Sequence, residues 1–262
     1  MAFIKHQGRI IHYRLLGAAD KPLLVLAHPL GMNQTIWDDI LADLLPVCRV
    51  LTWDLPGHGA SSAWPESSDA INPEDLAGEA LFLAKLANAD YFHFAGTSIG
   101  GVVGQQLLSQ HSEQLLSATL TNTGAVIGTP ENWQIRSNDV QNRGLAAMAA
   151  EIVPRWFGQK VCQQQPDLLA GWQQVLANVD DRSYALLSEM LGRTDFSAKL
   201  RDVRIPLQLL GGSDDVSTPP ATLQALAACT NGAEPLILAD VGHVPAIEAP
   251  PALSQLLLKR LK

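Results

Sequence analysis

Short apolar runs alternate along the chain with stretches of helical periodicity. The runs that we expect to form strands are residues 9–15, 23–27, 49–53, 92–96, 118–121, 207–210 and 236–238. Between two of them, apolar residues of 37–45 recur at helical spacing, and Asn72 followed by Pro73 is typical of a helix start. Such alternation indicates βαβ units, so we expect an α/β fold with a mostly parallel, twisted sheet flanked by helices.

Residues 124–200 break this alternation because their pattern is helical throughout. This stretch contains Trp133, Trp156 and Trp172 among many Gln, Asn and Ala residues. We interpret it as a helical lid inserted into a core formed by residues 1–123 and 201–262. The sequence shows no repeat of solenoid length, so one core with one insertion is the simplest organisation.

Composition and charge exclude several classes of partner. The 262 residues are 47% hydrophobic, which suffices for a large core, and the formal net charge is −8. Because nucleic-acid binding depends on clustered Lys and Arg, we expect no nucleic-acid partner. No apolar stretch approaches the roughly 20 residues needed to cross a bilayer, and the N-terminus lacks a signal-peptide pattern. We therefore expect a cytoplasmic protein without a membrane partner; no sequence feature indicates an oligomeric state.

The three cysteines do not predict a metal site or a disulfide framework. Cys48, Cys162 and Cys229 are far apart and lack the C-x-x-C spacing of zinc sites. We interpret them as reduced thiols that behave as small apolar residues. No metal or organic cofactor is expected.

One motif carries nucleophile chemistry. Gly96-Thr97-Ser98-Ile99-Gly100 matches G-x-S-x-G, with an apolar run directly before it and a helical pattern after it. A serine on a tight strand-to-helix turn is strained, and glycines beside it avoid side-chain collisions. The dipole of the following helix favours the negative charge that develops during attack. This setting resembles the nucleophile turn of the α/β-hydrolase superfamily, with Ser98 as the nucleophile.

A serine hydroxyl needs a histidine base and a carboxylate to orient that base, and α/β-hydrolases place them in the order Ser, acid, His. His243 follows the apolar run 235–238 in a loop, where it would lie at the carboxyl edge of the sheet. The segment 211–219 provides two adjacent carboxylates, Asp214 and Asp215. Spacing alone leaves both open as the acid.

Resemblance to the superfamily favours one of these carboxylates. In many α/β-hydrolases the acid loop reads G-x-x-D with T-P shortly after, and Gly212, Asp215, Thr218 and Pro219 fit this register. Other members carry the acid after the preceding strand, but residues 120–123 contain no carboxylate. The resemblance therefore implies Asp215.

The tetrahedral intermediate requires two backbone N–H donors. Ile99, directly after the nucleophile, is expected to supply one. Residues 26–31 resemble the H-G-x loop of the superfamily, which implies the Leu30 N–H as the second, although Pro29 stands where glycine is usual. We interpret His28 as a residue that shapes this loop.

Within the superfamily the chain resembles the 3-oxoadipate enol-lactonases. Residues 30–38 are similar to their L-G and M-W-D segment, and in the lid Trp133, Arg136 and residues 155–157 are similar to a W-x-x-R and R-W-F pattern. The resemblance implies that Trp133, Arg136 and Trp156 contact the substrate. Helix packing is the alternative role for both tryptophans, and a solvent-exposed position on the lid is the alternative for Arg136. A lactone of this family carries a free carboxylate, which the fork of Arg136 would suit.

These features predict a serine hydrolase that cleaves a carboxylic ester or lactone, with 3-oxoadipate enol-lactone as the substrate that the resemblance implies. Ser98, His243 and Asp215 would form the triad, with Leu30 and Ile99 as oxyanion donors. The alternatives are a general carboxylesterase, a cofactor-free perhydrolase or haloperoxidase, and a carbon–carbon bond hydrolase. A non-catalytic binding protein of the same fold is disfavoured by the complete triad.

Overall fold

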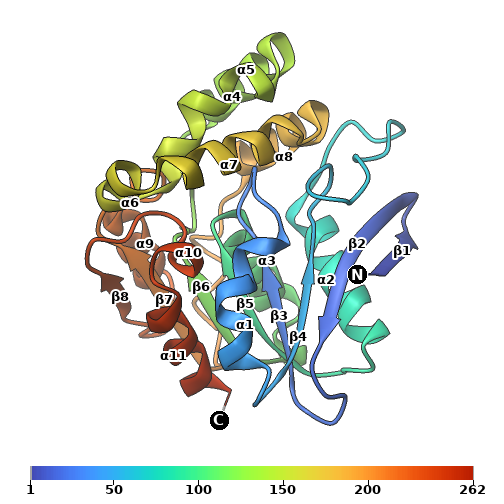
Figure 1. Ribbon diagram of the computed structural model, residues 1–262. Helices are drawn as coiled ribbons and strands as arrows, with labels where there is room; N and C mark the ends of the chain where they lie inside the picture. Colours follow the sequence, from blue (N-terminus) through green and yellow to red (C-terminus); the bar gives the residue numbers. More distant parts are fainter. Residues whose placement is uncertain (1, 262) are drawn as a thin grey trace.

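The computed structural model describes residues 2–261, and these contain one eight-stranded sheet (Figure 1). The strands are β1 (Ala2–His6), β2 (Arg9–Leu16), β3 (Leu23–Ala27), β4 (Arg49–Trp53), β5 (Phe92–Thr97), β6 (Leu115–Thr121), β7 (Leu207–Gly212) and β8 (Pro235–Leu238). Their spatial order is β1-β2-β4-β3-β5-β6-β7-β8. β1 and β2 are antiparallel to their neighbours, and β4 onward pair in parallel. The expected α/β fold with a mostly parallel sheet is confirmed, and β1 is an additional strand.

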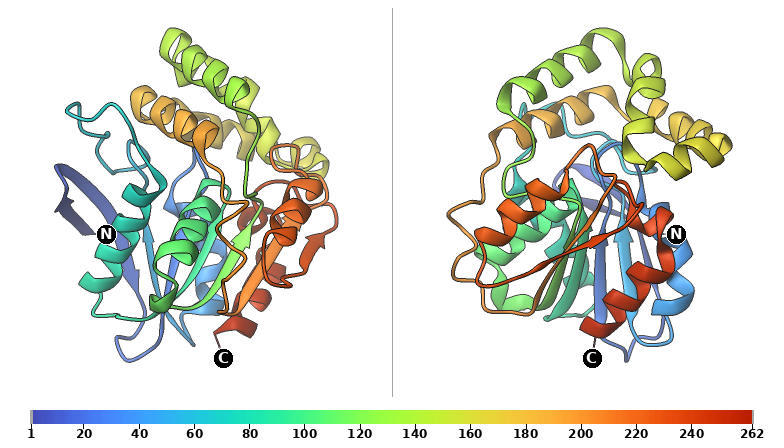
Figure 2. Two further views of the ribbon diagram at one scale, coloured as in Figure 1. Left: turned by 180° about the vertical axis from the view of Figure 1, so that it is seen from behind. Right: turned by 90° about the vertical axis from the view of Figure 1, so that its left-hand side faces the viewer.

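Helices cover both faces of the sheet. α1 (Asp38–Leu44) and α11 (Pro250–Arg260) lie on one face, and α2 (Pro73–Leu86), α3 (Ile99–Gln110) and α9 (Pro220–Ala228) lie on the other (Figure 2). The shorter helical elements of the core are η1 (Gln34–Trp37), η2 (Ser112–Gln114) and α10 (Pro245–Glu248). Across residues 2–261, no helix has both the length and the apolar character needed to span a membrane.

The chain between β6 and β7 is helical and lies beyond the carboxyl ends of the parallel strands (Figures 1 and 2). It forms α4 (Pro130–Arg143), α5 (Leu145–Ile152), η3 (Val153–Trp156), α6 (Gln159–Gln164), α7 (Pro166–Ala177) and α8 (Asp181–Arg193). α4 packs along α8, where the Ser137 hydroxyl donates to the Glu189 carboxylate at 2.8 Å. The division of the chain at residues 124 and 200 stays a prediction.

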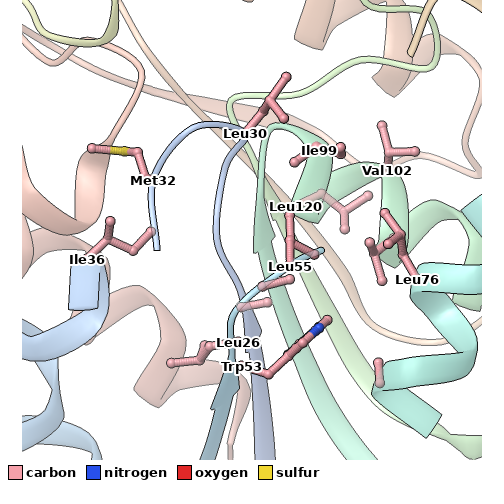
Figure 3. Close-up of a cluster of buried hydrophobic side chains, with 14 of the residues drawn as sticks. Leu26, Leu30, Met32, Ile36, Trp53, Leu55, Leu76, Ile99, Val102 and Leu120 are labelled. Atoms are coloured by element: carbon pink, nitrogen blue, oxygen red, sulfur yellow. The ribbon is translucent and has the colours of Figure 1, made fainter. Parts of the chain in front are cut away.

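The core lies under the ends of the central strands. Every residue of β3 is buried, as expected for a parallel strand covered on both faces. Leu26, Trp53 and Leu55 pack below the loop that carries Leu30 and below the start of α3 at Ile99 (Figure 3). The loops at this edge of the sheet are therefore supported by close-packed apolar side chains.

Candidate active site

Ser98 lies on a strained turn between β5 and α3. Its φ is 59° and its ψ is −117°, in the region that non-glycine residues rarely adopt. A Cβ at Gly96 would collide with the Gly100 carbonyl, and a Cβ at Gly100 would collide with the Ala27 carbonyl at the end of β3. The two glycines thus permit the turn and its close approach to the neighbouring strand.

His243 and Asp215 come together from two loops at the same edge of the sheet. His243 follows β8 and Asp215 follows β7, and the Nδ1 atom of His243 lies 2.8 Å from an Oδ atom of Asp215. Both side chains are almost completely buried. Ser98 and His243 line one cavity of about 70 Å³. With Nδ1 engaged by Asp215, Nε2 is the ring nitrogen of His243 that remains for proton transfer.

Four further donors hold the Asp215 carboxylate. It accepts the backbone N–H groups of Ser217 and Thr218 at 2.8 and 2.9 Å, the Thr218 hydroxyl at 2.7 Å and the Asn122 amide at 3.0 Å. Burial opposes ionisation of Asp215, but the charge of His243 and these hydrogen bonds lower its pKa to about 2. Asp215 is therefore ionised at neutral pH.

Asp214 faces a different set of groups. Its carboxylate accepts the Ser213 hydroxyl at 3.0 Å and the Gln159 N–H at 3.3 Å.

Asn122, at the end of β6, donates both to Asp215 and to the carbonyl of Gly242, beside His243. No local pattern singles out Asn122, because its contact with Asp215 spans 93 positions.

Glu248 braces the loop that carries His243, and sequence reasoning missed it. Its carboxylate accepts the N–H groups of Gly242 and Val244, on either side of His243, and of Gly158, at 3.0, 3.2 and 2.7 Å. Burial raises the pKa of Glu248, while these hydrogen bonds and His243 oppose the increase. Only a carboxylate acceptor satisfies all three donors at once.

Leu30 and Ile99, the two expected oxyanion donors, both belong to the cluster of buried apolar side chains at this edge of the sheet (Figure 3). Ile99 is the first residue of α3, so its N–H has no acceptor within the helix. Within residues 2–261, the Leu30 N–H donates to no protein acceptor, and Leu30 lines the cavity that holds Ser98. Two unused donors at the serine suit an oxyanion.

A second cavity, of about 270 Å³, adjoins the first. Ile127, Trp133, Trp156, Tyr184 and Ser217 line both cavities. The small cavity at Ser98 therefore continues into a larger space bounded by aromatic side chains. Sequence reasoning named the two tryptophans and missed Tyr184, which lies on α8.

Arginine side chains make the larger cavity positively charged. Arg136 and Arg155 both line it, whereas Arg143 pairs with Glu151 on the surface. Tyr184 lines the same cavity as Arg136; burial raises the pKa of Tyr184, and the charge of Arg136 opposes the increase. Residues 2–261 contain no cluster of three or more His, Cys, Asp or Glu side chains that could hold a metal ion.

Comparison with known proteins agrees with this fold. Residues 24–256 match the alpha/beta hydrolase family, and the chain belongs to that family. It is 28% identical over 249 residues to "3-oxoadipate enol-lactonase 2" of Acinetobacter baylyi, which covers 95% of this chain and 91% of that protein. It is 26% identical over 258 residues to "Putative carbamate hydrolase RutD" of Pantoea ananatis, covering 96% and 93%. The enol-lactonase from Burkholderia xenovorans LB400 superposes with a TM-score of 0.93 at 29% identity, covering 99% of both chains. The expected resemblance to enol-lactonases is thereby confirmed.

Proposed function

We propose that this protein hydrolyses a carboxylic ester or lactone through Ser98, His243 and Asp215. The observation that carries the proposal is the 2.8 Å contact between His243 Nδ1 and Asp215, made beside a cavity that His243 shares with the strained Ser98. A serine, a histidine and an ionised carboxylate in this relation can generate a nucleophile near neutral pH.

In the proposed reaction, the Ser98 Oγ attacks the acyl carbon and its proton passes to His243 Nε2. The oxyanion accepts hydrogen bonds from the Leu30 and Ile99 N–H groups. As the intermediate collapses, the bond to the leaving oxygen breaks and the proton of His243 neutralises that oxygen. Water, deprotonated by His243, then cleaves the acyl-enzyme and regenerates Ser98. Asp215 holds the imidazole ring and stabilises its charged form.

We propose an enol-lactone with a free carboxylate as the substrate. An enolate is a stabilised leaving group, and the enol tautomerises to a ketone after departure. Arg136 and Arg155 would bind the carboxylate in the larger cavity, between aromatic walls that include Trp133 and Trp156. The similarity to enol-lactonases supports this choice. Residues 124–200 would act as the lid that separates this pocket from solvent.

An activity screen tests the proposal. Purified protein and a Ser98→Ala variant are assayed on enol-lactones, simple lactones and short aryl esters. We expect turnover by the native protein, fastest on a carboxylate-bearing enol-lactone, and its loss by several orders of magnitude in Ser98→Ala. Turnover that survives Ser98→Ala would contradict the proposed chemistry. Faster turnover of neutral aryl esters than of enol-lactones would contradict the proposed substrate and indicate a general carboxylesterase.

A further inference from the structure

Two histidines cross-link the loops at the ends of β3 and β4. His58, in the loop after β4, accepts the Gly31 N–H at its Nε2 atom, at 2.9 Å. His28, in the loop after β3, accepts the Leu55 N–H at its Nε2 atom, at 3.0 Å. Each loop thus donates a backbone N–H to the histidine of the other loop. The centroids of the two imidazole rings lie 5.5 Å apart.

These contacts determine where each ring carries its proton. Because both Nε2 atoms accept a hydrogen bond, the proton of each neutral ring lies on Nδ1. His28 Nδ1 donates to the Pro29 carbonyl at 2.8 Å, and His58 Nδ1 donates to the Pro56 carbonyl at 2.7 Å. Both histidines are fully buried. Burial lowers the pKa of His28, and it lowers the pKa of His58 to about 3, so both rings are neutral at neutral pH.

The His28 contact fixes the direction of the Leu30 N–H. The carbonyl of Pro29 and the N–H of Leu30 belong to one planar peptide group, in which they point in opposite directions. The Met32 N–H donates to the same carbonyl at 3.3 Å. Since His28 and Met32 together hold the carbonyl on the buried side, the N–H of Leu30 points the other way. Rotation of this peptide would leave the buried Nδ1–H of His28 without an acceptor, which is costly.

The peptide between Leu30 and Gly31 is held by the loop after β4. The Gly31 N–H is engaged by His58, and Gly31 has a φ of 85° that a side chain would strain. A Cβ on Gly31 would lie 2.8 Å from the ring of Trp156. Both peptides that flank the Leu30 Cα are therefore fixed by a histidine.

We propose that His28 and His58 are positioning residues that aim the Leu30 N–H at the oxyanion, so that this donor is oriented before substrate binds. The inference rests on the proposed function of Ser98. It also gives a role to Pro29, which restricts its own φ in the loop while leaving its carbonyl available to His28.

Two variants of His28 separate this role from simple support of the fold. In His28→Asn the amide nitrogen takes the place of Nδ1, so the donor to the Pro29 carbonyl is kept and the acceptor for Leu55 is lost. In His28→Gln the longer side chain keeps an acceptor near the Nε2 position and loses the donor to Pro29. Each variant retains one of the two hydrogen bonds, so they are matched controls.

We expect His28→Gln to lower kcat by roughly 100-fold with little change in KM, in line with the loss of one oxyanion donor, and His28→Asn to retain most of kcat. Affinity for a trifluoromethyl ketone, which forms an oxyanion on Ser98, should fall in parallel with kcat/KM across the variants. Equal losses in both variants, or a change confined to KM, would overturn the positioning role.

A measurement on the native protein covers the case in which a variant fails to fold. Nitrogen-15 NMR of the histidine rings should show protons on Nδ1 of both His28 and His58 between pH 6 and pH 9. A proton on Nε2 of His28 would overturn the inference. Loss of turnover in Ser98→Ala together with native turnover in His28→Gln would refute the positioning role alone, whereas turnover in Ser98→Ala would refute the proposed function.

Discussion

The backbone N–H of His243 donates to the carbonyl of Trp156 at 2.9 Å. Trp156 lines both cavities, and it belongs to the helical segment between β6 and β7. Two residues further on, the Gly158 N–H donates to the same Glu248 carboxylate that accepts the N–H groups of Gly242 and Val244. The proposed base and a wall of the proposed substrate pocket are therefore joined through backbone hydrogen bonds.

Glu248→Gln should shift the acidic limb of the kcat/KM profile to lower pH. The substitution keeps the size of the side chain and removes a negative charge near His243, so the charged imidazolium is less stabilised. Steady-state kinetics from pH 4 to pH 8 measure the shift. Glu151→Gln, at an exposed carboxylate paired with Arg143, is the control and should leave the limb in place. An unchanged limb in Glu248→Gln would show that the carboxylate acts only through its hydrogen bonds.

The same variant should differ from the native protein in the pH dependence of stability. Because the folded-state pKa of Glu248 is raised, the folded chain binds this proton more readily than the unfolded chain. The contribution of Glu248 to the free energy of unfolding is therefore present below its ordinary pKa and falls as pH rises through the raised value. Urea unfolding at several pH values measures the free energy of unfolding of both proteins. As pH rises through this interval, the difference between them should change in favour of Glu248→Gln. A difference that stays constant with pH would contradict the assignment.

Asp215→Asn should lower turnover far more than Asp214→Asn. Asp215 contacts the His243 ring, whereas Asp214 binds Ser213 and Gln159. In a well-studied serine protease the equivalent change costs about 10⁴-fold in kcat. Parallel kcat measurements on both variants, with folding checked by circular dichroism, make the comparison. A larger loss from Asp214→Asn would reverse the order of the two carboxylates.

Arg136→Ala should raise KM for a carboxylate-bearing lactone by roughly tenfold or more, in line with about 1.5 to 3 kcal/mol for a charged hydrogen bond. Neutral aryl esters should be almost unaffected because they carry no anion for the cavity to bind. Arg143→Ala is the matched control, since Arg143 lies in the same helix α4 but pairs with Glu151 outside the cavity. Equal effects of Arg136→Ala on charged and neutral substrates would show that Arg136 supports the helices.

Local pattern predicted the sheet well because its central strands are buried on both faces and read as continuous apolar runs. β1 was not expected, since AFIKH is short and half exposed, and its strand geometry depends on pairing with β2. The sequence signal that could have revealed this hairpin is Gly8, because glycine favours the positive φ of 84° that the turn requires there.

Some residues of the candidate site can likewise be predicted from local pattern, and others cannot. Ser98 and His243 were predictable because each lies in a loop directly after an apolar strand. Asn122 and Glu248 were not, because their importance comes from contacts that only the folded chain creates. The orientation of the Leu30 peptide likewise depends on a second loop, which no local pattern describes.

The most direct test of the central claim is covalent labelling with an aryl fluorophosphonate, followed by peptide mass mapping. Attack by an activated serine expels fluoride and leaves a phosphonyl group on its oxygen. We predict a single adduct on Ser98, formed in step with loss of activity and absent from Ser98→Ala. An adduct on Ser109 or Ser213, with Ser98 unmodified in the inactivated protein, would contradict the assignment of the nucleophile.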